Sequence, residues 1–190
     1  NQVKTNSLIF EYLGIISFAA TMFICALSYP IFKLLFTEQY MSGYISAPYL
    51  FMAPLLQMLF QVAANQFLVV KKTWPNMLIL MSGAVINILI NLFLIPVLGI
   101  EGASIATLAG YFVSDLICVI VLCKMKLMVV RRKFIMASIY VVCFMVAWRM
   151  LFTTNVIVSM CLAISVCIIF AFLYRADLKK IKNIILNKSK

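Results

Sequence analysis

The chain has 190 residues, of which 66% are hydrophobic and 11% are charged, with a formal net charge of +11 and a mean hydropathy of +1.13. A soluble domain of this length cannot hide so much apolar surface, so the composition excludes the soluble classes of protein. The chain contains no histidine and therefore lacks the commonest metal ligand and the usual general base. We expect neither a metal site nor another cofactor.

Six apolar stretches are long enough to cross a membrane as helices, because about 20 apolar residues match the ~30 Å hydrocarbon layer. Residues 1–175 are therefore expected to form an all-α polytopic membrane protein with a single six-helix transmembrane unit. The predicted spans cover residues 8–30, 46–70, 76–98, 102–123, 134–152 and 156–174.

The basic residues give these spans an orientation. If six spans alternate, all but two of the 16 Lys and Arg residues fall on one side, and Lys33 and Arg149 are the exceptions. Cytoplasmic loops are enriched in Lys and Arg, so we place that side and both ends of the chain in the cytoplasm. Orientation and attraction to anionic membrane lipids explain the charge, and no nucleic-acid partner is expected. The residues assigned to this side are Lys4, Lys71, Lys72, Lys124, Lys126, Arg131, Arg132, Lys133, Arg175, Lys179, Lys180, Lys182, Lys188 and Lys190.

The second predicted span carries three amides, Gln57, Gln61 and Asn65, each four residues from the next. This spacing puts all three on one face of a helix. Polar groups inside a membrane are costly and face a protein interior or a water-filled cavity. The three amides are therefore candidates for lining a cavity, and the alternative is hydrogen bonding between packed helices.

The third predicted span carries Asn87 and Asn91, again four residues apart. They are further cavity-lining candidates. The alternative is that they join helices, because Ser82 and Gly83 lie one turn earlier and small residues favour close packing.

The turn between the third and fourth spans has a distinctive composition. Pro96, Gly99 and Gly102 predict a tight turn between two helices, with an outer loop at residues 99–101. Ala103, Ala106 and Gly110 then provide a smooth face for close packing. This stretch is interpreted as a structural helix hairpin.

Asp115, in the fourth span, is the one carboxylate well inside a span. An ionisable group at that depth is by default a functional hypothesis, so Asp115 is a candidate site for coupling to a proton or another ion. Two alternatives are a partnership with a basic residue and a position near the cytoplasmic boundary, where a charge costs little.

The tail, residues 176–190, is basic, with Leu178, Ile181, Ile184 and Ile185 at helical spacing. This pattern predicts either a short amphipathic helix on the cytoplasmic leaflet or a solvated basic tail.

Two segments carry a resemblance to a known family. Residues 87–96 read Asn-Ile-Leu-Ile-Asn-Leu-Phe-Leu-Ile-Pro, and residues 99–107 read Gly-Ile-Glu-Gly-Ala-Ser-Ile-Ala-Thr. Upstream, residues 30–36 read Pro-Ile-Phe-Lys-Leu-Leu-Phe. Over about residues 8–125 the chain resembles the C-terminal half of polysaccharide and O-antigen flippases, within the multidrug, oligosaccharidyl-lipid and polysaccharide exporter superfamily. The family often has glycine where this chain has Thr37.

The resemblance implies a fold of two six-helix lobes across a central cavity. This chain would form most of the C-terminal lobe, and the N-terminal lobe of the same protein would precede it. The implied function is the movement of undecaprenyl-pyrophosphate-linked glycans across the bacterial cytoplasmic (inner) membrane by alternating access, in O-antigen or capsule biosynthesis. Other glycan-assembly membrane proteins are implied partners. Family cavities are often basic, which makes Lys33 and Arg149 candidate contacts for the pyrophosphate anion.

Two other classes of function compete with this one. A cation-coupled multidrug exporter of the same superfamily shares the fold. A membrane glycan polymerase or acyltransferase would need a long outer loop with catalytic residues, and the predicted outer loops (residues 37–45, 99–101 and 153–155) are too short for that. The sequence also has no nucleotide-binding, nucleophile-elbow or metal motif, so we do not expect an enzyme.

Overall fold

The computed structural model describes residues 2–175 and residue 177. Among these residues, six helical segments are long and apolar enough to cross a membrane, and the protein is all-α and polytopic, as predicted. The amphipathic helix predicted in residues 176–190 falls almost entirely outside the described part. The elements are α1 (Gln2–Leu35), a 3₁₀ turn η1 (Glu38–Tyr40), α2 (Gly43–Val69), α3 (Trp74–Leu98), α4 (Ile100–Lys124), α5 (Arg132–Ala147), a π-helical segment η2 (Trp148–Phe152) and α6 (Val156–Leu173).

The first helix is longer than the span predicted at residues 8–30. It begins at Gln2 and continues through Pro30 to Leu35. At 1.5 Å per residue it extends about 50 Å, more than the ~30 Å hydrocarbon layer. The helix therefore extends beyond the apolar layer. Polar residues near its start can then form hydrogen bonds and ion pairs with other polar residues outside that layer.

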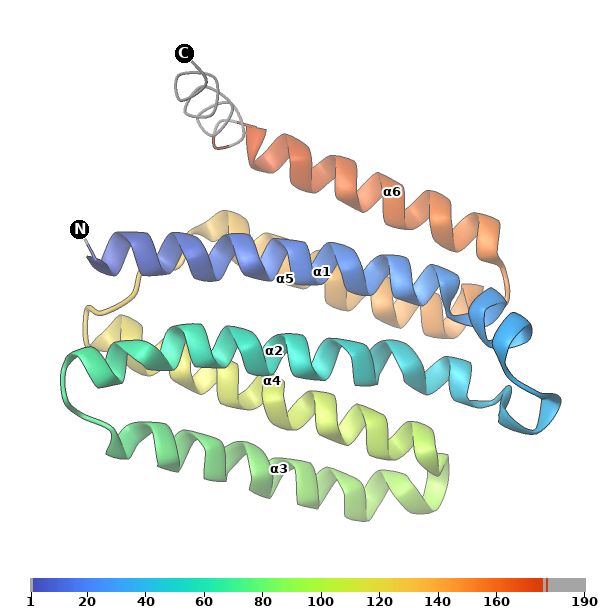
Figure 1. The fold of residues 1–190 in the computed structure, drawn as a ribbon, viewed down its shortest axis with the longest axis horizontal. Helices are drawn as coiled ribbons and strands as arrows, with labels where there is room; N and C mark the ends of the chain where they lie inside the picture. The colour runs from blue at the N-terminus through green and yellow to red at the C-terminus, as the bar shows by residue number, and fades with distance from the viewer. Residues whose placement is uncertain (1, 176, 178–190) are drawn as a thin grey trace.

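The helices form two layers, and α6 runs along the edge (Figure 1). In this view α1, α2 and α3 lie in front, and α4 and α5 lie behind them. Both α2 and α3 pack along α4 but scarcely touch one another, whereas α6 packs mainly on α1. The start of α1, the α2–α3 turn, the α4–α5 loop and the end of α6 gather at one end of the molecule. This arrangement brings the described basic loops together, as the alternation of spans requires.

The turn between α3 and α4 is tighter than the predicted loop at residues 99–101. Helix α3 passes through Pro96 and ends at Leu98, and α4 begins at Ile100. Only Gly99 lies outside both helices, with a φ of +55° that L side chains rarely adopt. The prediction that Glu101 and Gly102 belong to the turn is wrong, because one glycine with a positive φ is enough to reverse the chain.

Close contact between α3 and α4 depends on glycines. A Cβ atom added to Gly83 would lie 2.6 Å from the Gly110 carbonyl oxygen, and one added to Gly102 would lie 2.5 Å from the Leu94 carbonyl oxygen. Of the predicted small-residue face, Ala106 and Gly110 are buried, whereas Ala103 is only partly buried. Helices α3 and α4 thus form a closely packed pair.

Candidate functional site

The three predicted amides of α2 all lie on the surface of the helix bundle. Gln57, Gln61 and Asn65 are exposed, whereas Leu59 and Ala63 of the same helix are buried in the core. We call these three residues the amide stripe; it runs about 12 Å along α2 at the helical rise per residue. Amides in contact with lipid tails would lose their hydrogen bonds, so this face suits water or another protein surface rather than lipid.

At Gln57 the amide stripe joins a groove. Gln57 of α2 and Asn87 of α3 both line it, together with residues of α4, the helix that packs against both α2 and α3. This cavity has a volume of about 380 Å³, and we call it the polar groove. Its lining comprises Gln57, Leu80, Gly83, Ala84, Asn87, Ile88, Thr107, Gly110, Tyr111 and Ser114.

The two asparagines of α3 interact with each other. Asn91 Nδ2 donates a hydrogen bond of 2.7 Å to Asn87 Oδ1 one turn away. This bond holds the Asn87 amide on the wall of the polar groove, while Asn91 itself is half-buried and does not line it. The pair thus lies within one helix, and no hydrogen bond described for these side chains joins α3 to another helix.

The polar groove is also lined by polar residues of α4 that sequence reasoning did not single out. Thr107, Tyr111 and Ser114 of α4 all line it. Their spacing of four and then three residues places them on one helix face, and that spacing is the signal that could have revealed them. With Gln57 and Asn87, they give the groove neutral donors and acceptors and no charged lining residue.

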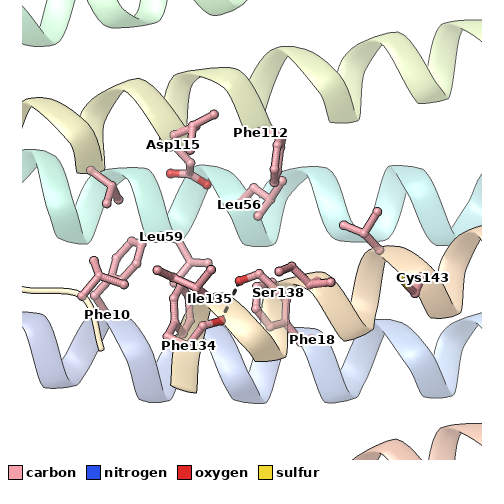
Figure 2. A pocket seen from close by; sticks show the side chains of 15 residues that line it. Phe10, Phe18, Leu56, Leu59, Phe112, Asp115, Phe134, Ile135, Ser138 and Cys143 are labelled. Carbon is pink, nitrogen blue, oxygen red and sulfur yellow. Dashed lines mark hydrogen bonds between the residues drawn. The ribbon is translucent and has the colours of Figure 1, made fainter. Parts of the chain in front are cut away.

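Asp115 follows Ser114 on α4 but faces a different cavity. Figure 2 shows its carboxylate pointing from α4 into a pocket with Phe10, Phe18 and Phe134 on the opposite side. The side chain is buried, and within the described part of the chain neither carboxylate oxygen has a hydrogen-bond partner. Among the described residues Asp115 forms no salt bridge, so they do not provide the basic partner that was one of its three predicted environments.

The two candidate anion contacts differ. Arg149 donates from both Nε and Nη2 to the carboxylate of Glu101, so its charge is already paired at the start of α4. Lys33 lies near the end of α1 and is exposed. These two basic residues do not line the polar groove.

A second ionic cluster lies at the opposite end of the molecule. The buried Glu11 carboxylate accepts hydrogen bonds from the backbone N–H of Arg131 at 2.9 Å and from its Nε. Arg131 Nη1 also donates to Asp177 at 2.7 Å, and its guanidinium lies over the rings of Tyr12 and Tyr174. Burial alone would lower the pKa of Arg131, but the hydrogen bonds and charges of Glu11 and Asp177 raise it above its ordinary value. Arg131 therefore stays charged.

No protein-family model, curated protein or solved structure matches this chain. Its class rests on the fold, which is that of a helical protein crossing the membrane several times. Among the described residues no cluster of His, Cys, Asp and Glu could hold a metal ion.

Proposed function

We propose that this chain forms one lobe of a flippase that moves lipid-linked oligosaccharides or polysaccharide precursors across the cytoplasmic membrane by alternating access. The observation that carries the proposal is the exposed amide stripe, which continues into the polar groove at Gln57. A surface of this kind needs water or a polar ligand at membrane depth, and a transport cavity between two lobes supplies both.

The chemistry of the groove favours a sugar as its ligand. Sugar hydroxyls both donate and accept hydrogen bonds, and so do the amide of Asn87 and the hydroxyl of Tyr111. The Thr107 hydroxyl donates to the Ala103 carbonyl oxygen at 2.9 Å and can still accept a hydrogen bond. The groove has no charged side chain to attract a phosphate. We therefore infer that this lobe contacts the neutral glycan, and that the pyrophosphate is held elsewhere in the full transporter.

The proposal is tested with the full-length transporter in liposomes containing an undecaprenyl-pyrophosphate-linked oligosaccharide with a fluorescent sugar. Quenching by a membrane-impermeant reductant measures how fast the labelled sugar reaches the outer leaflet. Each of Gln57→Leu and Asn87→Leu is expected to slow transport about threefold to tenfold, because each removes hydrogen bonds worth ~1 kcal/mol to the sugar. Gln2→Leu, an exposed amide at the far end of α1, is the matched control and is expected to leave the rate unchanged.

Two results would contradict the proposal. One is an unchanged rate in the double variant of Gln57 and Asn87. The other is a wild-type protein that moves no lipid-linked sugar but exports cationic drugs against a concentration gradient; that result would support the cation-coupled multidrug exporter instead.

A further inference from the structure

The pocket around Asp115 is separate from the polar groove and has a different chemistry. It lies between α4 and α5 with α1 and α2 beneath, and its volume is about 360 Å³. Phenylalanines come from three helices: Phe10 and Phe18 of α1, Phe112 of α4 and Phe134 of α5. Phe134 packs against both α1 rings, with centroids 5.4 Å from Phe10 and 5.7 Å from Phe18. One wall of the pocket is thus a cluster of aromatic rings.

Asp115 supplies the only carboxylate in this lining (Figure 2). The residue is 8% exposed and its two oxygens are unpartnered within the described part of the chain. An ionised carboxylate in apolar surroundings is costly unless a positive charge accompanies it. A proton or a bound cation would therefore stabilise the Asp115 carboxylate in this pocket.

The lining argues against a small inorganic cation. Mg²⁺ and Ca²⁺ take about six or more oxygen ligands, and Ser138 is the one lining residue besides Asp115 whose side chain carries oxygen. Ser138 Oγ already donates to the Phe134 carbonyl oxygen at 3.0 Å. A proton alone would neutralise Asp115, but the pocket of about 360 Å³ has room beside the carboxylate for a much larger group that brings its own positive charge.

The rim of the pocket shows how a ligand would enter. Leu116 of α4 and Ile135 and Ile139 of α5 all line the pocket and are exposed. Because these rim residues are apolar and lie on membrane-spanning helices, the opening faces the hydrocarbon layer. A ligand that enters here must dissolve in lipid.

We propose that this pocket binds a lipophilic organic monocation, of the quaternary ammonium or phosphonium class, which enters from the bilayer between α4 and α5. Asp115 neutralises the charge, and the aromatic rings contact the cation through cation–π attraction and apolar burial. The proposal does not depend on the proposed flippase function, since the polar groove and this pocket share no lining residue.

Equilibrium dialysis of the protein in lipid nanodiscs against radiolabelled tetraphenylphosphonium tests this site. We expect saturable binding to the wild type, and an affinity about tenfold lower or weaker still in Asp115→Asn, because that isosteric change removes the attraction between the charges. Glu38→Gln removes an exposed carboxylate outside the membrane and is expected to bind as the wild type does. Thermal unfolding of the wild type and of each variant in the same nanodiscs checks that every protein in the comparison is folded.

A second pair of variants tests the aromatic wall. Phe112→Leu is expected to weaken binding about threefold, as the loss of one cation–π contact predicts, whereas Phe93→Leu, an exposed residue of α3 outside the pocket, leaves binding unchanged. Uncharged triphenylphosphine oxide is not expected to displace the probe. Equal affinity in the wild type and Asp115→Asn would overturn the proposal. Displacement by the neutral compound as effective as by the cation would also overturn it and would indicate a pocket for uncharged lipid-soluble molecules.

Discussion

At the scale of single residues, glycines decide how closely α3 approaches α4. A Cβ atom on Gly83 would lie 1.9 Å from Ser114 Oγ and 2.6 Å from the Gly110 carbonyl oxygen. Ser114 lines the polar groove, and Gly83 and Gly110 lie beside it in the same lining. The absence of a side chain at position 83 therefore sets both the packing of the hairpin and the width of the groove.

Gly83→Ala is expected to destabilise the protein by about 1–3 kcal/mol, the range typical of overpacked interfaces, because the Gly110 carbonyl oxygen cannot move aside within its helix. The measurement is chemical unfolding in mixed detergent micelles. Adding Ser114→Ala relieves only the contact with the hydroxyl, so it should restore little. Gly43→Ala is the control: its nearest neighbour is the ring of Phe32, which can rotate, so a smaller loss is expected. Equal losses at the two glycines would refute this reading of the interface.

At the scale of elements, one arginine forms ion pairs that connect the loop before α5 to α1 and to the residues that follow α6. Arg131, in the loop before α5, is bonded to Glu11 of α1 and to Asp177 beyond α6. Two further bonds support the junction: the Val129 N–H donates to Ser7 Oγ at 3.0 Å, and Lys133 Nζ donates to the Leu173 carbonyl oxygen at 2.8 Å. Since α4 and α5 make few direct contacts, this cluster helps to hold the start of α5 against α1.

Arg131→Gln is expected to destabilise the protein by about 3 kcal/mol, because it leaves the Glu11 carboxylate buried without a counter-charge. Combining it with Glu11→Gln should recover part of the loss, since both charges are then absent. Arg132→Gln, at an exposed neighbouring position, is expected to change stability by less than ~0.5 kcal/mol. Unfolding titrations of the wild type, the two single variants Arg131→Gln and Glu11→Gln, and the double variant form a double-mutant cycle, with Arg132→Gln as its control; additive effects of Arg131 and Glu11 would show that the pair is not coupled.

At the scale of the whole molecule, the two ends differ in charge. Among the described residues, one end carries Lys33 and Arg149, and the second of these is neutralised by Glu101. The other end carries the basic turn after α2 and the basic loop after α4. Such an asymmetry orients helical membrane proteins with the basic end in the cytoplasm.

Thiol labelling of intact cells checks this orientation in a variant from which the six native cysteines are removed. Ser42→Cys, exposed before α2, is expected to react with a membrane-impermeant maleimide. Lys72→Cys, exposed after α2, is expected to react only after the cells are permeabilised. The reverse pattern would invert the proposed orientation, and labelling of both positions in intact cells would show that α2 does not cross the membrane.

The amino-acid sequence alone was enough to establish the membrane class, the six spans and the helical face shared by Gln57, Gln61 and Asn65, because hydropathy and helical spacing are local properties of the chain. It also indicated a hairpin at Gly99, although the turn proved shorter than the glycines and proline suggested. Only the tertiary structure decided that Gln57 and Asn87 line the same groove, that Arg149 is paired with Glu101, and that Asp115 faces a cluster of aromatic rings. Each of these depends on contacts between residues about 30 to 100 positions apart in sequence, which follow from how helices pack and not from the spacing along any one of them.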